Sequence, residues 1–535
     1  MPKIRAALVS AIAVSLVLPV APAATAAPSA ETLPLNSTAI PDRFAAQLLD
    51  WHLCRADELP FAPPAGAEHL ECATYRTPRD WDNLADKREL TIAISRLPST
   101  GVAKASVVIN PGGPGQPGRI FAAKLRRQKE LLAEQEVIGF DVRGTGHSTN
   151  VSCGGAFGRM ASGDSRDRAD ANLRLILNNT KGIVEECQRN AGDLGPVIST
   201  LQTIKDMDLL RVLLRRPKIN YVGWSGGTWL GAYYAQAYPK RVGNFALDSV
   251  VRFTGSWEEN FRRQPMGYER KWRVDFLPWM AKYDKVYGFG TTSEDVRQQF
   301  EQMRKVIAAK PIVYNGVRLS PDAFDQLARD GIYYTAQYPT TASMLVDIRT
   351  LTSAAPAAAK SAAAQRIQRR QQAVDTDLQA APMAADAYPS TFWSILCNDG
   401  PWPTTEDGAI KQSQQFLDDG LTLAGGQWVM QPCMYWNRPP TQFPVIDGKG
   451  VPPVLLVQSE RDPATPIEGA LEAHAGFANS RLLTVTDEGQ HGIYASNPPY
   501  KNLRVDELVD TFLLTGQLPA EKSVPGMPPQ PPPGG

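Results

Sequence analysis

The chain has 535 residues, 43% of them hydrophobic, so it is long and apolar enough for one large domain with an insertion or for two to three domains. The formal net charge is only +1, which gives no basis for binding nucleic acid or an anionic membrane. The sequence is silent on oligomeric state, and we take a monomer as the default.

The first 26 residues have the pattern of a secretory signal peptide. Lys3 and Arg5 form a basic start, an apolar run covers residues 6–20, and the small residues at 24–26 form a cleavage site. The run has about 15 apolar residues, fewer than the roughly 20 that a transmembrane helix needs. We therefore expect secretion, with no membrane anchor, and a mature chain that begins near Ala27 and is essentially neutral.

Six cysteines in a secreted protein predict disulfide bonds, but six cysteines allow 15 connectivities. We prefer pairs of neighbours, each of which closes a loop of roughly 20 to 40 residues. These pairs are Cys54–Cys72, Cys153–Cys187 and Cys397–Cys433. Metal binding is the alternative, but no Cys-x-x-Cys or His-x-x-x-His spacing supports it. We expect neither a metal nor another cofactor.

Short apolar runs of about 5 to 7 residues, rich in Val, Ile and Leu, predict buried parallel strands. They lie near Ser106, Val137, Ile219, Asn244, Pro453 and Arg481. Helix-like segments follow several of them, for example from Leu201 and from Gly227. Alternating strands and helices predict an α/β fold with a doubly wound, mostly parallel sheet, formed by residues 27–251 and 451–522.

The alternation stops between residues 252 and 450, which we interpret as an inserted, mostly helical cap. This block contains an Ala/Gln/Arg-rich stretch at 353–385, which we expect to be an exposed helix or a partly mobile segment. It also contains seven tryptophans, Trp257, Trp272, Trp279, Trp393, Trp402, Trp428 and Trp436, which either pack the cap or line a pocket. Residues 523–535 are rich in Pro and Gly and predict a disordered tail.

The segment Gly223-Trp224-Ser225-Gly226-Gly227 is a G-x-S-x-G motif between a predicted strand and a predicted helix. In that context the motif indicates a nucleophile elbow, a sharp turn that presents a serine hydroxyl at the carboxyl end of a sheet. The flanking glycines leave room for the chain to reverse closely. We predict Ser225 to be the nucleophile.

A serine nucleophile needs a histidine as general base, and in this fold the histidine comes last in the chain. His491 lies in a loop directly after the last predicted strand, where that base belongs. His474 lies in a helical pattern, and His147 precedes the serine. We therefore predict His491 to be the base.

The carboxylate that orients the histidine is expected in the loop after the preceding strand. Asp462 lies there, in "SERDPATP". Glu460 is the nearby competitor, and Asp248 and Asp487 are weaker ones. We predict Asp462 to be the acid of the triad.

The oxyanion formed by nucleophilic attack needs fixed hydrogen-bond donors. One is expected to be the N–H of Gly226, directly after the serine. The other is expected in the loop "NPGGPGQPG" after an early strand, at Gly113. A plain turn is the alternative; a phosphate-binding P-loop is excluded because no Lys-Ser/Thr pair follows.

At this point the sequence resembles the secreted tripeptidyl aminopeptidases of Streptomyces, members of the prolyl-aminopeptidase-like serine peptidases with an α/β-hydrolase fold. The resembling segments are "NPGGPG", "GFDVRGTGHS", "NYVGWSGGTWLGAYYAQAYP", "LDSVV", "PPVLLVQSERDPATP" and "VDTFLLTG". They occur in the family's order and span most of the mature chain. The resemblance implies the same triad and oxyanion loop, and release of tripeptides from free peptide N-termini.

The resemblance has two departures. Gly226 stands where family members often carry tyrosine, and Leu396 stands where they often carry a glutamate that can hold the substrate's ammonium. Asp399 is the remaining candidate for that role. The alternative function is a secreted carboxylesterase or lipase-like hydrolase, with the same triad and with cap tryptophans around an acyl group. A binding module on an inactive hydrolase fold is a third hypothesis, disfavoured because all three triad residues are present.

Overall fold

The computed structural model describes residues 39–379, 385–437, 443–527, 529 and 531–532. The predicted signal peptide lies outside the described residues. In the described part of the chain, no helix has the length and apolar character needed to cross a membrane. The cysteines form the three predicted neighbour pairs, so that prediction is confirmed.

A ten-stranded sheet forms the centre of the molecule, with the strand order β1-β2-β3-β5-β4-β6-β7-β10-β11-β12. Its strands are β1 (His52–Leu53), β2 (Glu71–Pro78), β3 (Glu89–Leu97), β4 (Ala105–Asn110), β5 (Gln135–Phe140), β6 (Ile219–Trp224), β7 (Val242–Asp248), β10 (Val454–Ser459), β11 (Ser480–Thr486) and β12 (Ser523–Pro525). From β5 to β12 every neighbouring pair is parallel, whereas β1, β2, β3 and β5 pair antiparallel. This is the α/β-hydrolase fold predicted from the sequence, and all six predicted strands are present.

Helices cover both faces of the sheet because alternate residues of the central strands point to opposite sides. Val108 of β4 packs in the core shared with α4 and α5, whereas Val107 packs in the core shared with α2 and α16. The core helices are α1 (Asp42–Ala45), α2 (Lys129–Glu134), α4 (Thr200–Leu213), α5 (Gly226–Ala237), α15 (Ile467–Gly476) and α16 (Leu503–Thr515).

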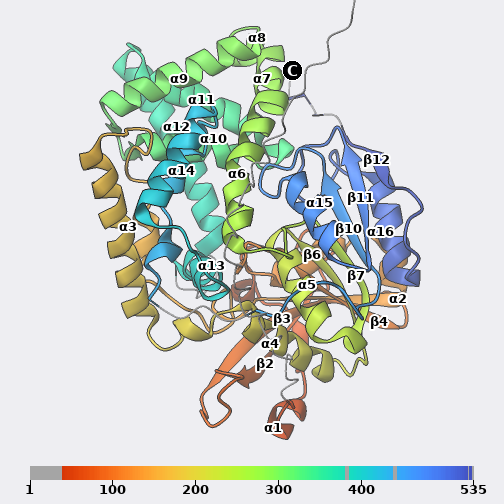
Figure 1. The fold of residues 1–535 in the computed structure, drawn as a ribbon. Coiled ribbons are helices and arrows are strands. Elements are labelled where there is room, and N and C mark those ends of the chain that lie inside the picture. Colours follow the sequence, from red (N-terminus) through yellow and green to blue (C-terminus); the bar gives the residue numbers. More distant parts are fainter. Residues whose placement is uncertain (1–38, 380–384, 438–442, 528, 530, 533–535) are drawn as a thin grey trace, which may run out of the picture.

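The cap lies between β7 and β10 in the sequence and, in Figure 1, beside the sheet. It contains α6 (Trp257–Lys271), the π-helical turn η6 (Trp272–Phe276), α7 (Leu277–Lys282), α8 (Asp284–Tyr287), α9 (Ser293–Ala309), the hairpin β8 (Ile312–Tyr314) and β9 (Val317–Leu319), α10 (Pro321–Gly331), α11 (Tyr338–Thr352), α12 (Ala357–Gln379), α13 (Ala387–Asn398) and α14 (Glu406–Asp418). A capping box fixes the start of α6: Ser256 accepts from the Glu259 N–H, and the Glu259 carboxylate accepts from the Ser256 N–H. The cap has its own apolar core.

A helix from the first half of the chain also packs against the cap. Helix α3 (Asp170–Ala191) lies beside α14 in Figure 1, away from the sheet, and its Leu173, Ile176 and Leu177 pack with Val429. The first half of α3 therefore buries its apolar face against the cap, whereas Ile183, Val184 and Cys187 in its second half pack in the core next to the sheet. The sequence-based domain boundary assigned all of residues 27–251 to the core. It did not anticipate that residues 164–166 and α3 contact the cap.

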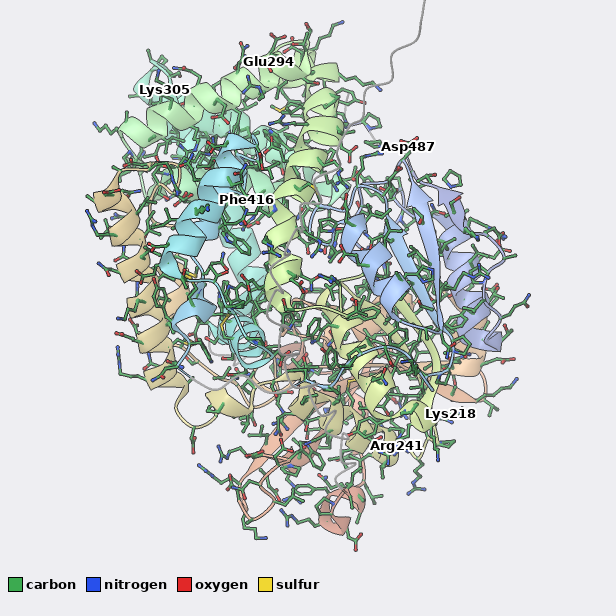
Figure 2. All side chains as sticks on the ribbon, viewed as in Figure 1. Lys218, Arg241, Glu294, Lys305, Phe416 and Asp487 are labelled. Carbon is green, nitrogen blue, oxygen red and sulfur yellow. A yellow bond between two sulfur atoms is a disulfide. The ribbon has the colours of Figure 1, made fainter. Side chains whose placement is uncertain are left out.

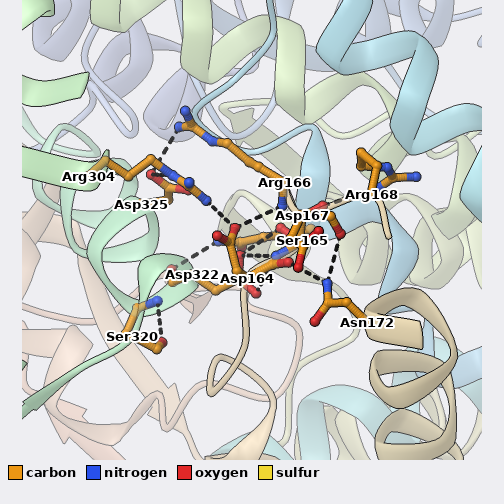
Figure 3. Close-up of polar contacts among 12 residues, drawn as sticks. Asp164, Ser165, Arg166, Asp167, Arg168, Asn172, Arg304, Ser320, Asp322 and Asp325 are labelled. Atoms are coloured by element: carbon orange, nitrogen blue, oxygen red, sulfur yellow. Dashed lines mark hydrogen bonds and ion pairs between the residues drawn. The ribbon is translucent and has the colours of Figure 1, made fainter. Parts of the chain in front are cut away.

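A buried charge cluster holds residues 164–166, which precede α3, to the cap (Figure 3). Asp325 of α10 accepts hydrogen bonds from Arg166 at 2.9 Å and from Arg304 of α9 at 2.9 Å, and its side chain is only 2% exposed. Arg304 also donates to Asp164 at 2.6 Å. Residues 164–166 are thus held to α9 and α10 by charges that solvent screens only weakly.

We expect Asp325→Ala to lower the free energy of unfolding by about 3–5 kcal/mol, because it leaves two arginines of a buried ion-pair cluster without their shared carboxylate. Urea denaturation followed by tryptophan fluorescence measures the loss. The control is Glu294→Ala, which breaks an exposed pair with Arg297 on α9 and should leave the stability unchanged. A loss for Asp325→Ala no larger than that of the control would contradict this role for the cluster.

Two expectations about flexible segments need correction. The predicted disordered tail at 523–535 begins with β12, which pairs parallel with β11 and buries Val524, because the edge of β11 offers unpaired backbone groups. The Ala-rich stretch forms α12, and its Ala363, Ala364 and Ile367 are buried in the cap core, so the helix is not simply exposed. Residues 380–384 of that stretch, and the last residues of the tail, lie outside the described residues.

Candidate active site

Ser225 lies at the junction of β6 and α5, with φ 55° and ψ −125°. Such a positive φ is strained for a residue with a side chain and persists only where the surroundings enforce it. Here the Ser225 N–H donates to the Asp248 carbonyl oxygen at 3.0 Å. A β-carbon added at Gly223 would overlap with the carbonyl oxygen of Gly227, so the turn needs the glycines of the motif. The local geometry is that of the predicted elbow.

His491 and Asp462 are brought together from the loops after β11 and β10. The Nδ1 atom of His491 lies 2.9 Å from both carboxylate oxygens of Asp462, and both side chains are buried. Asp462 Oδ1 also accepts from the N–H groups of Ala464 and Thr465, at 2.9 Å each. Burial alone would raise the pKa of Asp462, but the neighbouring His491 and these hydrogen bonds hold it below its ordinary value. The carboxylate is therefore ionised and its imidazole partner is oriented.

The other candidate acids lie elsewhere and make no hydrogen bond to the His491 side chain in the described contacts. Asp248 accepts from the N–H groups of Ile493 and Tyr494 at 2.7 Å, beneath the histidine loop, and burial raises its pKa to about 6. The side chain of Glu460 is 47% exposed. Asp487 is 97% exposed, and Figure 2 shows it at the periphery of the molecule. Among the candidate acids, Asp462 is the one in contact with the histidine.

The glycine-rich loop after β4 packs against the elbow. Gly112 and Gly113 have φ values of +98° and +102°, and a β-carbon added at Gly112 would overlap with the carbonyl oxygen of Trp224. A β-carbon added at Gly226 would lie only 2.9 Å from the backbone nitrogen of Pro114, which explains why glycine follows the serine in this chain. As the first residue of α5, Gly226 has an N–H without an intrahelical acceptor. The backbones of Gly113 and Gly226 are thus close to each other next to Ser225.

A cavity of about 690 Å³ opens above these residues, and Ser225, His491 and Gly113 line it together. Its other walls come mainly from the cap and are rich in aromatic side chains. Four of the seven cap tryptophans line it, namely Trp257, Trp393, Trp402 and Trp428. Trp272 and Trp279 pack in the cap core instead, and Trp436 packs in the core next to the sheet. Both sequence-based readings of the tryptophans therefore hold for part of the set.

The prediction that Asp399 binds an ammonium group is not supported by its position. Its buried carboxylate accepts from the N–H and the hydroxyl of Thr200, at 2.9 and 2.6 Å, and from the Trp257 indole at 3.3 Å. Burial raises its pKa to about 7. Neither Asp399 nor the buried Leu396 is among the residues that line the cavity. This corrects the sequence-based assignment, because the carboxylate faces the start of α4.

Among the described residues that line the cavity, Arg329 and Asp330 at the end of α10 are the ones with an Arg, Lys, Asp or Glu side chain. Arg329 donates to Asp330 at 3.0 Å and to the Gln427 side chain at 2.9 Å. The Asp330 side chain is 56% exposed and pairs with Arg329. No signal in the sequence distinguishes Asp330 from other helical carboxylates. In the described part of the chain, no group of three or more His, Cys, Asp or Glu residues is arranged to hold a metal ion.

Known proteins are similar to this chain over most of its length. A tripeptidyl aminopeptidase of Streptomyces lividans is 31% identical over 498 residues, which cover 89% of this chain and 86% of that protein. The chain belongs to the tripeptidyl aminopeptidase family. A model of that family, described as TAP-like protein, matches residues 422–525. The protein is thus a hydrolase, and its place in the tripeptidyl aminopeptidase family supports a serine peptidase activity.

More distant relatives of this tripeptidyl aminopeptidase family member have other printed names. The serine protease Hip1 of Mycobacterium tuberculosis is 26% identical over 88% of this chain and 90% of that protein. Carboxylesterase B of Mycobacterium tuberculosis is 23% identical, with 88% of each chain covered. Similar chains therefore include proteins named as peptidases and one named as an esterase.

Proposed function

We propose that the protein is a secreted serine exopeptidase that releases tripeptides from the free N-termini of peptides. The observation that carries this proposal is the cap-covered cavity onto which a strained serine, a carboxylate-oriented histidine and Gly113 of the glycine-rich loop all open. The name of the Streptomyces lividans relative supports the tripeptide specificity. The three disulfides, and the predicted signal peptide at residues 1–26, support secretion.

In the proposed mechanism, His491 takes the proton of the Ser225 hydroxyl as the oxygen attacks the scissile carbonyl. Asp462 holds Nδ1–H and stabilises the imidazolium that forms. The N–H groups of Gly113 and Gly226 stabilise the oxyanion. His491 then gives its proton to the leaving amine, the tripeptide remains as an ester on Ser225, and water releases it by the same steps in reverse order.

The acyl half of such a substrate is the N-terminal tripeptide, so the cavity that holds it must also accept an ammonium group. A tripeptide spans about 10 Å when extended, and a cavity of about 690 Å³ is in the range of small-ligand sites. Of the cavity-lining residues that the structure describes, Asp330 is the one that carries a carboxylate. We therefore propose Asp330, in place of Asp399, as the residue that selects a free N-terminus.

We expect Asp330→Asn to raise KM for a tripeptide substrate with a free N-terminus by about 10- to 100-fold, the value of a hydrogen bond to a charged group. Its kcat should change little, because the ammonium is far from the bond that breaks. Steady-state kinetics with a chromogenic tripeptide amide measures both constants. The N-acetylated compound is the internal control, and an equal rise of KM for both compounds would argue against ammonium binding by Asp330.

Three substrates test the proposed function as a whole. They are a chromogenic tripeptide amide with a free N-terminus, its N-acetylated form and a short fatty-acid ester. Preference for the free amine supports the exopeptidase, and equal cleavage of both amides indicates an endopeptidase-like cleft. Turnover of the ester alone would replace the proposal with the second candidate, a carboxylesterase, which the aromatic cavity walls and the relative named carboxylesterase B favour.

A further inference from the structure

The loops that carry His491 and Asp462 are held not only by the sheet but also by the cap. On the sheet side, the Arg461 N–H donates to the Glu488 carbonyl oxygen at 2.8 Å, which ties the two loops to each other. The hydroxyl of Ser459 donates to the carbonyl oxygen of Gln490. These contacts fix the base of each loop, and the upper side of both loops faces the cap.

Lys271, the last residue of α6, reaches from the cap to the histidine loop. Its ammonium group donates to the carbonyl oxygen of Gly489, two residues before the histidine, and to that of Tyr333 at 3.2 Å. The side chain is fully buried. Burial lowers the pKa of Lys271 to about 8, while the neighbouring carboxylate of Asp275 opposes this shift. A buried ammonium group is costly unless it is paired, and here the two carbonyl oxygens and the nearby carboxylate of Asp275 compensate for the loss of water.

Asp275, four residues further along in the π-helical turn η6, reaches the aspartate loop. Its Oδ1 atom lies 2.9 Å from Nε of Arg461, the residue directly before Asp462. A β-carbon added at Gly489 would overlap with Oδ2 of Asp275 and would lie 3.5 Å from Cε of Lys271. Side chains four residues apart project from the same side of a helix, and π-helical turns often occur at functional sites. Both cap residues therefore pack on the same stretch of the histidine loop.

The segment after α10 also contacts the histidine loop. The Thr335 N–H donates to the side-chain oxygen of Gln490 at 3.0 Å. The ring of Tyr333 meets the imidazole ring of His491 edge-on, with centroids 4.5 Å apart. Because the carbonyl oxygen of Tyr333 accepts from Lys271, the same lysine that holds the histidine loop also holds the ring against the imidazole.

We infer that Lys271 and Asp275 are positioning residues that set the geometry of the His491–Asp462 pair, so that turnover requires the cap to be docked on both loops. The inference rests on the proposed function, because it assumes that this pair activates Ser225. The cap thereby does more than limit access to the cavity. Without the lysine, the Gly489 and Tyr333 carbonyl groups lose their shared donor. The Tyr333 ring is then no longer held in a fixed position against the imidazole.

The test compares Lys271→Met, which keeps the length of the side chain, with Asp275→Asn and with Arg273→Ala as the matched control. Arg273 lies in the same π-helical turn, but its side chain is 51% exposed and pairs with Glu269. For Lys271→Met we expect kcat to fall by about 100-fold, the effect of a small displacement of a catalytic group. KM should change by less than about threefold, and the low-pH limb of kcat/KM, which reports the free histidine, should shift. Arg273→Ala should leave all three unchanged.

Each variant is also labelled with a fluorophosphonate, so that rates are expressed per reactive serine and loss of folded protein is not counted as loss of catalysis. Slower labelling of Lys271→Met than of the wild type supports the inference. A per-site kcat and pH profile equal to those of Arg273→Ala would overturn it. If Lys271→Met does not fold, Asp275→Asn decides by the same measurements. Failure of the wild type to be labelled at Ser225 would instead refute the proposed function.

Discussion

Replacing Ser225 with alanine is expected to lower kcat for the tripeptide amide by about 10⁵- to 10⁶-fold, the effect of removing a triad nucleophile. The alanine leaves the imidazole of His491 and the oxyanion donors in place, but no acyl-enzyme can form. The remaining rate reflects binding and electrostatic stabilisation alone. Initial rates with the chromogenic substrate, together with the loss of fluorophosphonate labelling, measure the effect.

The control for this experiment is Ser99→Ala, which removes a hydroxyl that donates to the carbonyl oxygen of Gly101 in a turn outside the cavity. It should retain full activity. Residual activity of Ser225→Ala within about tenfold of the wild type would exclude Ser225 as the nucleophile, because removal of a triad nucleophile lowers kcat by about 10⁶-fold.

Replacing Asp462 with asparagine is expected to lower kcat by about 10⁴-fold. The side-chain amide would donate to Nδ1 of His491, where the carboxylate accepts at 2.9 Å, and would stabilise the tautomer that protonates Nε2. The imidazole would then be unable to accept the serine proton. Unchanged thermal stability of the variant, measured alongside its kinetics, would show that the loss is chemical.

Asp487→Asn provides the matched control for the acid. Asp487 is close to His491 in the sequence and was a candidate acid, but its carboxylate is almost fully exposed. Its variant should be as active as the wild type. A larger loss of activity in Asp487→Asn than in Asp462→Asn would reverse the assignment of the acid.

The central sheet could be predicted from the sequence because its parallel strands are buried on both faces and therefore appear as continuous apolar runs. The antiparallel strands β2 and β3 were not predicted. Part of each is exposed, so that buried residues such as Tyr75 stand beside exposed ones such as Arg76. The strand β12 was not predicted because Pro-rich sequence surrounds it. Its formation depends on pairing with the sheet edge at β11, which lies earlier in the sequence.

The triad candidates could be predicted because each lies at the end of a strand, where local pattern and chain order are informative. The cavity walls could not, because they depend on how the cap helices pack. The proximity of Asp399 to Cys397 in the sequence does not reveal that its carboxylate turns toward Thr200. Likewise, Lys271 and Asp275 resemble ordinary helix-surface charges until the helix is placed against the histidine loop.

The route of α3 has a practical consequence for engineering. Because residues near 164–166 are bound to α9 and α10, the roof over the cavity is assembled from two pieces of polypeptide that are far apart in the sequence. A chimera that exchanges only residues 252–450 with a relative would separate Arg166 from its carboxylate partners. To transfer substrate preference between such enzymes, both the cap and the segment around residues 164–166 and α3 should be exchanged. The chimera then has four junctions between the parental sequences instead of two.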